Sequence, residues 1–177
     1  MSKKILILSG SPRKKGNSDL LCSEFARGAE ASGHSVEKVY IQDLKIGSCM
    51  ACYGCRGTGS CVQNDDMTQL LEKMIASDVI VLATPVYFYS MCGQMKTMID
   101  RTLPSYTEIT DKDFYFIATA AAGAGAIQRT MDSLAGFTDC LPGAKVKDMI
   151  YGGGVYEKGD VTDTDNMKKA YELGLNV

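Results

Sequence analysis

Four cysteines crowd into one short stretch of the chain, at a spacing that suits a metal or redox centre. Cys49, Cys52, Cys55 and Cys61 lie within 13 residues in the pattern C-x2-C-x2-C-x5-C, and the intervening glycines predict a cysteine-rich loop over residues 48–62. Thiolates at this spacing can hold an iron–sulfur cluster, and the same set could bind a tetrahedral zinc ion. The pattern is also consistent with free thiols that line a redox pocket, or with thiols that pack as small hydrophobic groups.

A second candidate site is the polar loop that follows the first apolar run of the chain. Residues 5–8 read as a strand buried on both faces, and turn residues and then a helix follow. Such a junction presents backbone N–H groups and the positive end of a helix dipole, which suit a phosphate. The loop matches neither GxGxxG nor GxxxxGK[ST], and a polar surface turn is the alternative. The candidate phosphate ligands are Ser9, Ser11, Arg13, Asn17 and Ser18.

Aromatic and small residues follow two further predicted strands, at residues 78–84 and 114–120. In an open parallel sheet, ligands bind beyond the carboxyl ends of the strands, so these residues are expected beside the polar loop. The aromatic group could hold a flat ring by backbone contacts and stacking, and the small group would leave room for it. A helix-docking cluster or a subunit interface is the alternative for the aromatic group. The residues concerned are Pro85, Val86, Tyr87 and Phe88 in the first group, and Ala120, Ala121 and Gly123 in the second.

Composition narrows the class of protein. The chain has 177 residues, which suits one α/β domain, and 45% of them are hydrophobic, as in ordinary globular proteins. Its net charge of -2, without long runs of like charge, argues against nucleic acid as the main partner. No apolar stretch approaches the roughly 20 residues of a membrane span, so we expect a cytoplasmic protein without a membrane partner. Seven cysteines in that compartment point to metal, cluster or redox chemistry rather than structural disulfides.

The order of apolar runs and helical patterns predicts the fold. Strands are expected near residues 3–8, 35–41, 78–84, 114–120 and 145–151, with about five helices between and after them. Alternation of this kind indicates a single domain over residues 1–177, with a doubly wound parallel α/β sheet in three layers, α/β/α. The strand order expected is 2-1-3-4-5, as in flavodoxin-like folds. Glycines 152–154 are predicted to form a flexible turn with little affinity for phosphate.

Several other polar and sulfur-containing residues receive structural interpretations. Asn17 and Ser18 are expected to cap the first helix, over residues 18–32, and Asp66 with Gln69 has the pattern of a capping box. His34, the only histidine, is expected in a surface turn. The isolated cysteines are interpreted as core or helix-face residues. They are Cys22, Cys92 and Cys140.

Four segments together resemble a known family. The sequence is similar to the flavodoxin-like NAD(P)H-dependent FMN reductases, and within them to the iron–sulfur flavoproteins. The segments are residues 9–18, the cysteine run 49–61, residues 65–67, and residues 84–88 with Lys96, Asp100 and Arg101. The resemblance implies a flavodoxin-like fold, bound FMN, and a homodimer or homotetramer. It also implies that residues 9–18 hold the FMN phosphate, that Pro85–Phe88 and Ala120–Gly123 lie near the flavin ring, and that the four cysteines bind a [4Fe-4S] cluster.

The expected function is therefore that of an FMN-dependent oxidoreductase. FMN would carry the chemistry, and electrons would pass between NAD(P)H or a ferredoxin-like donor and a small-molecule acceptor. A cluster passes single electrons, so it would suit conversion between one- and two-electron partners. No residue stands out as a catalytic acid or base, since no histidine faces the site. The alternatives are a quinone, nitro or azo reductase with unligated cysteines, and a flavodoxin-like electron carrier without a substrate of its own.

Overall fold

The chain folds around a central parallel sheet. A computed structural model describes all residues, 1–177. Its five parallel strands run in the spatial order β2-β1-β3-β5-β6, which confirms the predicted order 2-1-3-4-5. A short strand, β4, is not indicated by the sequence pattern, and it pairs antiparallel with the end of β3. The strands are β1 (Lys4–Ser9), β2 (Ser35–Tyr40), β3 (Val79–Tyr87), β4 (Ser90–Met91), β5 (Asp113–Thr119) and β6 (Lys145–Gly152).

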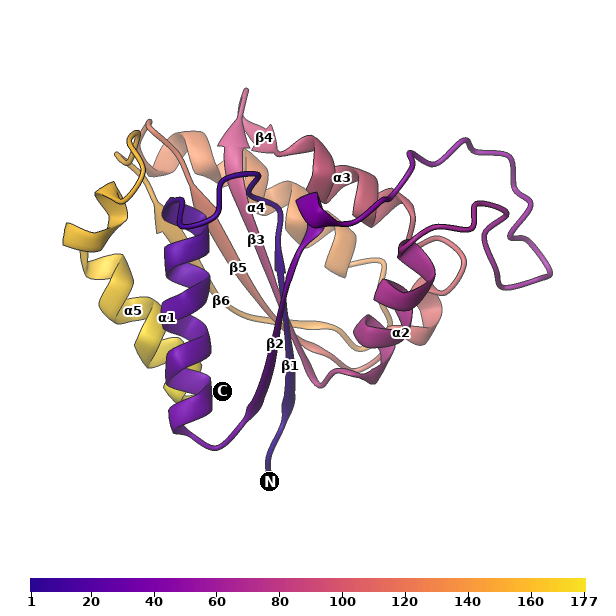
Figure 1. Cartoon of the computed structure of the whole chain (residues 1–177), viewed down its shortest axis with the longest axis horizontal. Coiled ribbons are helices and arrows are strands. Elements are labelled where there is room, and N and C mark those ends of the chain that lie inside the picture. Colours follow the sequence, from indigo (N-terminus) through magenta and orange to yellow (C-terminus); the bar gives the residue numbers. More distant parts are fainter.

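Helices cover both faces of the sheet, which gives the predicted three layers (Figure 1). One face carries α1 (Asn17–Ala31) and α5 (Asp165–Leu175), and the other carries α2 (Met67–Ala76), α3 (Gly93–Asp100) and α4 (Ala124–Thr138). Three single turns of 3-10 helix, η1 (Ile41–Asp43), η2 (Tyr106–Glu108) and η3 (Asp160–Asp163), lie in the connections. No helix of the chain has both the length and the apolar character that a membrane crossing requires.

The apolar run of β1 shows why the sheet needs helices on both sides. Successive side chains of a strand point to opposite faces. Ile5 and Ile7 pack into the core formed with α1 and α5, whereas Leu6 and Leu8 pack into the larger core formed with α2, α3 and α4. All four side chains are at most 2% exposed. The unbroken apolar run is therefore a sound indication of a strand buried on both faces.

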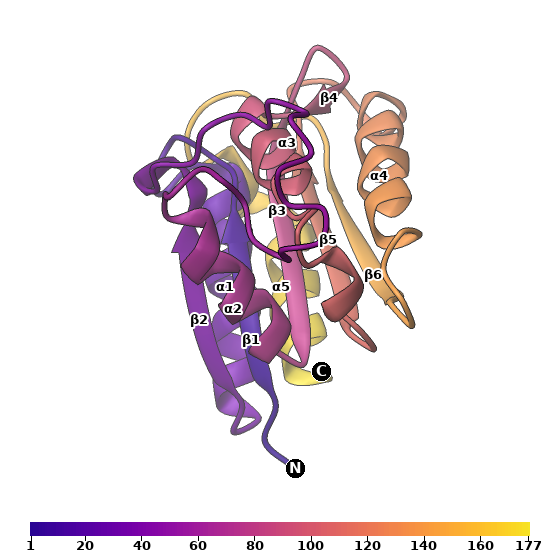
Figure 2. The same ribbon diagram turned by 90° about the vertical axis from the view of Figure 1, so that its right-hand side faces the viewer.

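All five parallel strands direct their carboxyl ends to one edge of the sheet, where the β1–α1 loop (residues 10–16) lies. A different connection, residues 44–66 between η1 and α2, extends outward from the layers (Figures 1 and 2). We call residues 44–66 the cysteine segment, because it contains the four closely spaced cysteines. It contains no helix or strand, and Ala51 and Tyr53 have positive φ values of 50° and 56°.

Two capping predictions are wrong. The N-cap of α1 is Gly16, and no side chain caps that helix, because the side chains of Asn17 and Ser18 bond to other segments. The carboxylate of Asp66 accepts a hydrogen bond from the backbone of Lys45 and does not cap α2. These side chains form hydrogen bonds with distant segments, although their spacing in the sequence suits local capping.

Candidate functional site

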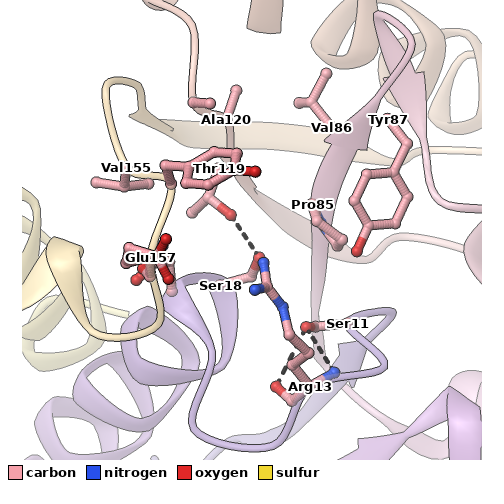
Figure 3. Close-up of a pocket in the computed structure, with 13 residues that line it drawn as sticks. Ser11, Arg13, Ser18, Pro85, Val86, Tyr87, Thr119, Ala120, Val155 and Glu157 are labelled. Atoms are coloured by element: carbon pink, nitrogen blue, oxygen red, sulfur yellow. Dashed lines mark hydrogen bonds between the residues drawn. The ribbon is translucent and has the colours of Figure 1, made fainter.

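A polar cavity of about 400 Å³ opens at the carboxyl edge of the sheet (Figure 3). It lies among the β1–α1 loop, the end of β3, the end of β5 and a C-terminal segment. Nine of the predicted cofactor-binding residues line it, so sequence positions more than 100 residues apart meet in one place. They are Ser11, Arg13, Asn17, Ser18, Pro85, Val86, Tyr87, Ala120 and Ala121.

The floor of the cavity is built by the β1–α1 loop and the first turn of α1. The Ser11 hydroxyl accepts a hydrogen bond from the Arg13 amide at 3.2 Å, which closes a tight turn before the helix. Because no side chain caps α1, its first N–H groups have no intrahelical partner and remain free for a ligand. The Arg13 guanidinium makes no ion pair and extends into the cavity. This combination suits an anionic group.

Asp19 fixes the loop from behind and does not line the cavity. Its buried carboxylate accepts hydrogen bonds from the Lys15 amide at 2.6 Å, the Lys38 Nζ at 2.8 Å and the Tyr40 hydroxyl at 3.2 Å. Burial alone would lower the pKa of Lys38, but the hydrogen bonds with Asp19 and Tyr40 outweigh burial and raise it. The carboxylate is thus neutralised within the fold, and the cavity side of the loop keeps its positive character.

The walls come from the ends of β3 and β5. Pro85, Val86 and Tyr87 form one wall. Thr119 leads into Ala120 and Ala121 on the other, and its hydroxyl lies 2.7 Å from the Ser18 hydroxyl (Figure 3). This bond links the floor to the second wall. The small side chains keep the second wall open enough for a flat ligand.

The segment after β6 completes the cavity, although its glycines predict only a flexible turn. Residues 153–159, between β6 and η3, form a strap that contributes Val155, Tyr156 and Glu157 to the lining. The Asn17 side chain holds this strap: its Nδ2 donates to the Glu157 carbonyl at 2.9 Å, and its Oδ1 accepts from the Gly159 amide at 3.0 Å. No sequence pattern indicates this contact, which spans about 140 positions. Sequence reasoning also misses Thr119, although its place at the end of a strand could suggest it.

Three predicted cofactor-binding residues lie outside the cavity lining. The Ser9 side chain is buried at the end of β1, and its hydroxyl has no hydrogen-bond partner. Phe88 stands fully exposed at the tip of the β3–β4 hairpin, with φ at 50°. Gly123 is the N-cap of α4. The aromatic residues therefore belong partly to a hairpin tip: Tyr87 lines the cavity, and Phe88 is exposed and does not line it.

The four clustered cysteines line a second, mostly apolar cavity between the cysteine segment and the C-terminal end of α3. The chain contains no group of three or more Cys, His, Asp or Glu side chains placed to hold a metal ion. A zinc site needs all its sulfurs about 2.3 Å from one centre. A four-iron cluster instead takes one thiolate on each iron, so its four sulfurs lie well apart around a larger body. The four thiols are the donors that such a cluster requires, and they surround a cavity of about 20 Å³.

A buried ion pair attaches the cysteine segment to α3. Arg101 Nη2 donates to Asp65 Oδ1 at 2.9 Å, and Nη1 donates to Asp65 Oδ2 at 2.7 Å and to the Gly47 carbonyl at 2.7 Å. Burial opposes ionisation of Asp65, but the hydrogen bonds from Arg101, Gly47 and Met67 outweigh burial and lower its pKa. The sequence indicates for Asp65 only a place at the start of a helix. Its main role is this tertiary contact.

The two cavities share no lining residue.

The three isolated cysteines differ in exposure: Cys22 and Cys92 are buried, as interpreted, and Cys140 is exposed on the turn after α4. Burial raises the pKa of Cys22 to about 12. His34 follows α1, as expected, and its Nδ1 accepts a hydrogen bond from the Lys3 amide. Neither cavity therefore contains a histidine.

The chain is similar to known proteins in sequence and in fold. An iron–sulfur flavoprotein from Archaeoglobus fulgidus is 38% identical over 176 residues, covering 95% of this chain and 76% of that protein. One from Methanocaldococcus jannaschii is 31% identical over 136 residues, covering 76% of this chain and 70% of that protein. A solved flavone reductase shares the fold, with a TM-score of 0.78 at 23% identity, over 98% of this chain and 61% of the reductase.

The family profile of the NADPH-dependent FMN reductases matches residues 3–150, which include the β1–α1 loop, the cysteine segment and both walls of the polar cavity. The match therefore covers most of the chain and both candidate sites except the strap over the polar cavity. The chain belongs to the NADPH-dependent FMN reductase family, and it is an oxidoreductase.

Proposed function

We propose that the chain binds FMN in the polar cavity and uses it to pass electrons from NAD(P)H to a small acceptor. The observation that carries this proposal is the uncapped start of α1 beneath a cavity of about 400 Å³. Free helix amides, the Ser11 and Ser18 hydroxyls and the Arg13 guanidinium offer donors to a phosphate. The helix amides and the Arg13 guanidinium have no other partner in the fold, so a phosphate there would satisfy them, whereas Ser11 and Ser18 already bond to Arg13 and Thr119.

The flavin ring is proposed to lie between the two walls. Pro85, Val86 and Tyr87 would face one part of the ring, and Ala120 and Ala121 would leave room for another. Bound FMN supplies hydride and single-electron chemistry, while the protein supplies binding and orientation. The chain offers no histidine and no buried acid to this cavity, so its residues exclude water and orient the ring, and are not expected to transfer protons.

We further propose that Cys49, Cys52, Cys55 and Cys61 hold a [4Fe-4S] cluster. The donor set supports it: four thiols line one apolar cavity, and the Arg101 Nε beside them is buried without an acceptor. A cluster would let the protein exchange single electrons with a ferredoxin-like donor as well as take two electrons from NAD(P)H. Both cofactors would then serve one small-molecule acceptor.

The alternative is an FMN reductase of quinone, nitro or azo substrates in which the cysteines stay unligated. The exposure of Cys49 and Cys52 favours this alternative, because a resident cluster is normally shielded from solvent. Iron and acid-labile sulfide, measured after purification without oxygen, decide between the two. About four irons and four sulfides per chain support the cluster, and their absence supports the alternative. Cys52→Ser should remove the cluster and leave FMN bound.

The FMN proposal is tested by comparing two arginine variants with two ligands. Arg13→Ala removes the guanidinium from the cavity, and Arg27→Ala removes an exposed arginine of α1 that pairs with Glu24. Loss of a charge-assisted hydrogen bond costs about 1.5–3 kcal/mol, which is roughly a ten- to hundredfold increase in Kd. We expect this increase for FMN with Arg13→Ala, measured by quenching of flavin fluorescence, and wild-type affinity with Arg27→Ala.

Riboflavin, which lacks the phosphate, provides the matched ligand. Its affinity should be the same for wild type and Arg13→Ala, because Arg13 is proposed to contact only the phosphate. Wild-type protein that fails to bind FMN, or an Arg13→Ala variant that weakens FMN and riboflavin equally, would contradict the proposed binding mode. NADPH oxidation by the FMN-loaded protein then separates an enzyme from an electron carrier.

A further inference from the structure

Arg101 is a buried, ion-paired arginine with one hydrogen-bond donor left without a partner. It is the C-cap residue of α3, and its side chain is 1% exposed, among the largest fully buried side chains of the chain. Its terminal nitrogens are all engaged, by Asp65, Gly47 and, at 3.3 Å, Gln63. Its Nε is the only buried side-chain nitrogen in the chain without a hydrogen-bond partner. A buried N–H group without an acceptor costs about 1–3 kcal/mol, so its retention calls for an explanation, and an acceptor supplied by a bound group is one.

Arg101 and Cys61 line the same two cavities. Both line the cavity of the clustered cysteines. Both also line a further cavity, distinct from the two described above, between α2 and residues 104–108. Cys61 is the only one of the four cysteines that lines both cavities. The pKa of Arg101 is raised chiefly by its hydrogen bonds with Asp65, and its interaction with Cys61 also contributes. Of the four thiols, Cys61 is therefore the one beside the guanidinium.

We propose that Arg101 is a positioning residue for the cluster: its Nε–H donates a hydrogen bond to the cluster-bound sulfur of Cys61 and raises the cluster's reduction potential. This inference rests on the cluster proposed above. A donor directed at a ligand sulfur stabilises the more negative, reduced cluster, and such bonds are among the factors that set its potential. Asp65 offsets the full positive charge of Arg101, so the N–H···S bond is the main remaining influence of this side chain.

The fold makes Arg101 suited to this task, because three contacts fix the guanidinium before any cluster is present. The Asp65 pair is bidentate, and Gly47 and Asp65 lie on either side of the cysteines in the chain. The two ends of the cysteine segment are therefore held at one point of α3. A donor held in this way does not need to reorient when the cluster gains an electron, which keeps its effect on the potential.

The test compares two arginine-to-lysine variants. In Arg101→Lys the lysine chain places a methylene where Nε stood and an ammonium near Asp65, so the charge stays and the sulfur donor is lost. In Arg56→Lys the same change is made at an exposed arginine that stacks on Tyr53, next to Cys55 in the chain. Both proteins are purified without oxygen, their iron and sulfide are counted, and the cluster potential is measured by EPR-monitored redox titration.

We expect Arg101→Lys to retain its iron and sulfide with a potential below that of wild type, and Arg56→Lys to keep the wild-type potential. An unchanged potential in iron-loaded Arg101→Lys overturns the inference and leaves the cluster itself supported. Wild-type protein without iron overturns the cluster, and the inference with it. The two failures are therefore distinguishable.

A measurement on wild-type protein covers the case in which Arg101→Lys fails to fold or loses iron. Wild type and Arg56→Lys are labelled with 15N-arginine, and the reduced cluster is examined by pulsed EPR. We expect one 15N coupling to the cluster in both proteins. Absence of any arginine coupling in the iron-loaded wild type, or its loss in Arg56→Lys, overturns the assignment to Arg101.

Discussion

At the scale of single residues, Asn17 shows how one side chain can serve a site without acting on a substrate. Its amide lies at the start of α1, at the edge of the polar cavity, and it bonds to the backbone of the C-terminal strap. The Val161 amide adds a third, longer bond of 3.4 Å to the same Oδ1. Asn17 therefore couples the first helix to a segment near the other end of the chain.

Replacing this amide should loosen the strap. Asn17→Ala removes the part-buried hydrogen bonds to the backbone of Glu157 and Gly159, which we expect to cost about 0.5–1.5 kcal/mol for each bond. Thermal unfolding should show the loss, and hydrogen exchange should show faster exchange at the Gly159 and Val161 amides. Asn176→Ala removes an exposed amide bonded only to the Glu172 carbonyl, and it should change little. Unchanged exchange in Asn17→Ala would mean that other contacts hold the strap.

At the scale of elements, α1 and α5 pack unusually close together. A glycine on each helix, facing the backbone of the other helix, permits this approach. An added Cβ at Gly28 of α1 would lie 2.1 Å from the Tyr171 carbonyl of α5. One at Gly174 of α5 would lie 2.0 Å from the Phe25 carbonyl of α1. Each helix thus presents a bare backbone to the other. Because α5 follows the strap, this contact also sets where the strap begins and ends.

Two glycine-to-alanine changes separate packing from helix propensity. Gly28→Ala and Gly136→Ala both lie late in helices of 15 residues, and alanine favours both helices to the same extent. At Gly28 the new methyl group meets backbone that cannot yield, so we expect a net loss of about 1–3 kcal/mol. At Gly136 nothing lies within 4 Å, so we expect a gain of about 0.4–1 kcal/mol.

Urea denaturation followed by circular dichroism measures both changes. The two variants should shift the unfolding midpoint in opposite directions. Equal stabilisation by both would show that α1 and α5 can separate without cost.

At the scale of the whole molecule, two separate cavities lie on one α/β domain built around a single parallel sheet. The polar cavity lies at the carboxyl edge of the strands, and the cysteine cavity lies against the end of α3. The Asp65–Arg101 pair alone joins the cysteine segment to the body by opposite charges, with the Arg101 side chain 1% and the Asp65 side chain 15% exposed. The position of the segment should therefore depend on the charge of one carboxylate.

This dependence predicts a stability difference that varies with pH. Asp65→Asn leaves the Arg101 charge buried without compensation, which we expect to cost about 3 kcal/mol at pH 7. The pKa of Asp65 is lowered in the folded state, so its contribution is present above the pKa of the unfolded chain, about 3.9. The contribution is lost as pH falls through the folded value. The gap between wild type and Asp65→Asn should therefore be full at pH 7 and shrink below pH about 4.

Urea unfolding at a series of pH values measures this gap. Asp66→Asn serves as the neighbouring control, since Asp66 makes one bond to the Lys45 backbone and no ion pair. Its difference from wild type should stay small at every pH. A gap for Asp65→Asn that persists unchanged at pH about 3 would show that the carboxylate is not the source of the stabilisation.

Local patterns in the sequence were enough for the architecture and for most of the candidate sites. Unbroken apolar runs predict the buried strands β1, β3 and β5, and the alternation of strands and helices predicts the observed order of all five parallel strands. The same order brings the loops after β1, β3 and β5 to one edge, so nine predicted residues meet around one cavity. The spacing of the four cysteines likewise predicts that they act together, and they line one cavity.

The hydrogen-bond partners of polar side chains that could also cap a helix became known from the three-dimensional structure. Asn17 and Asp66 have the sequence patterns of helix caps, but their side chains form hydrogen bonds with the backbone of Glu157 and Lys45 instead. The strap over the cavity and the unpaired Arg101 Nε arise from contacts between distant segments. A hydrogen bond depends on distance in space, and a chain pattern reports distance only along the sequence. Strand order and helix faces therefore follow from the sequence, and the pairing of polar groups follows from the fold.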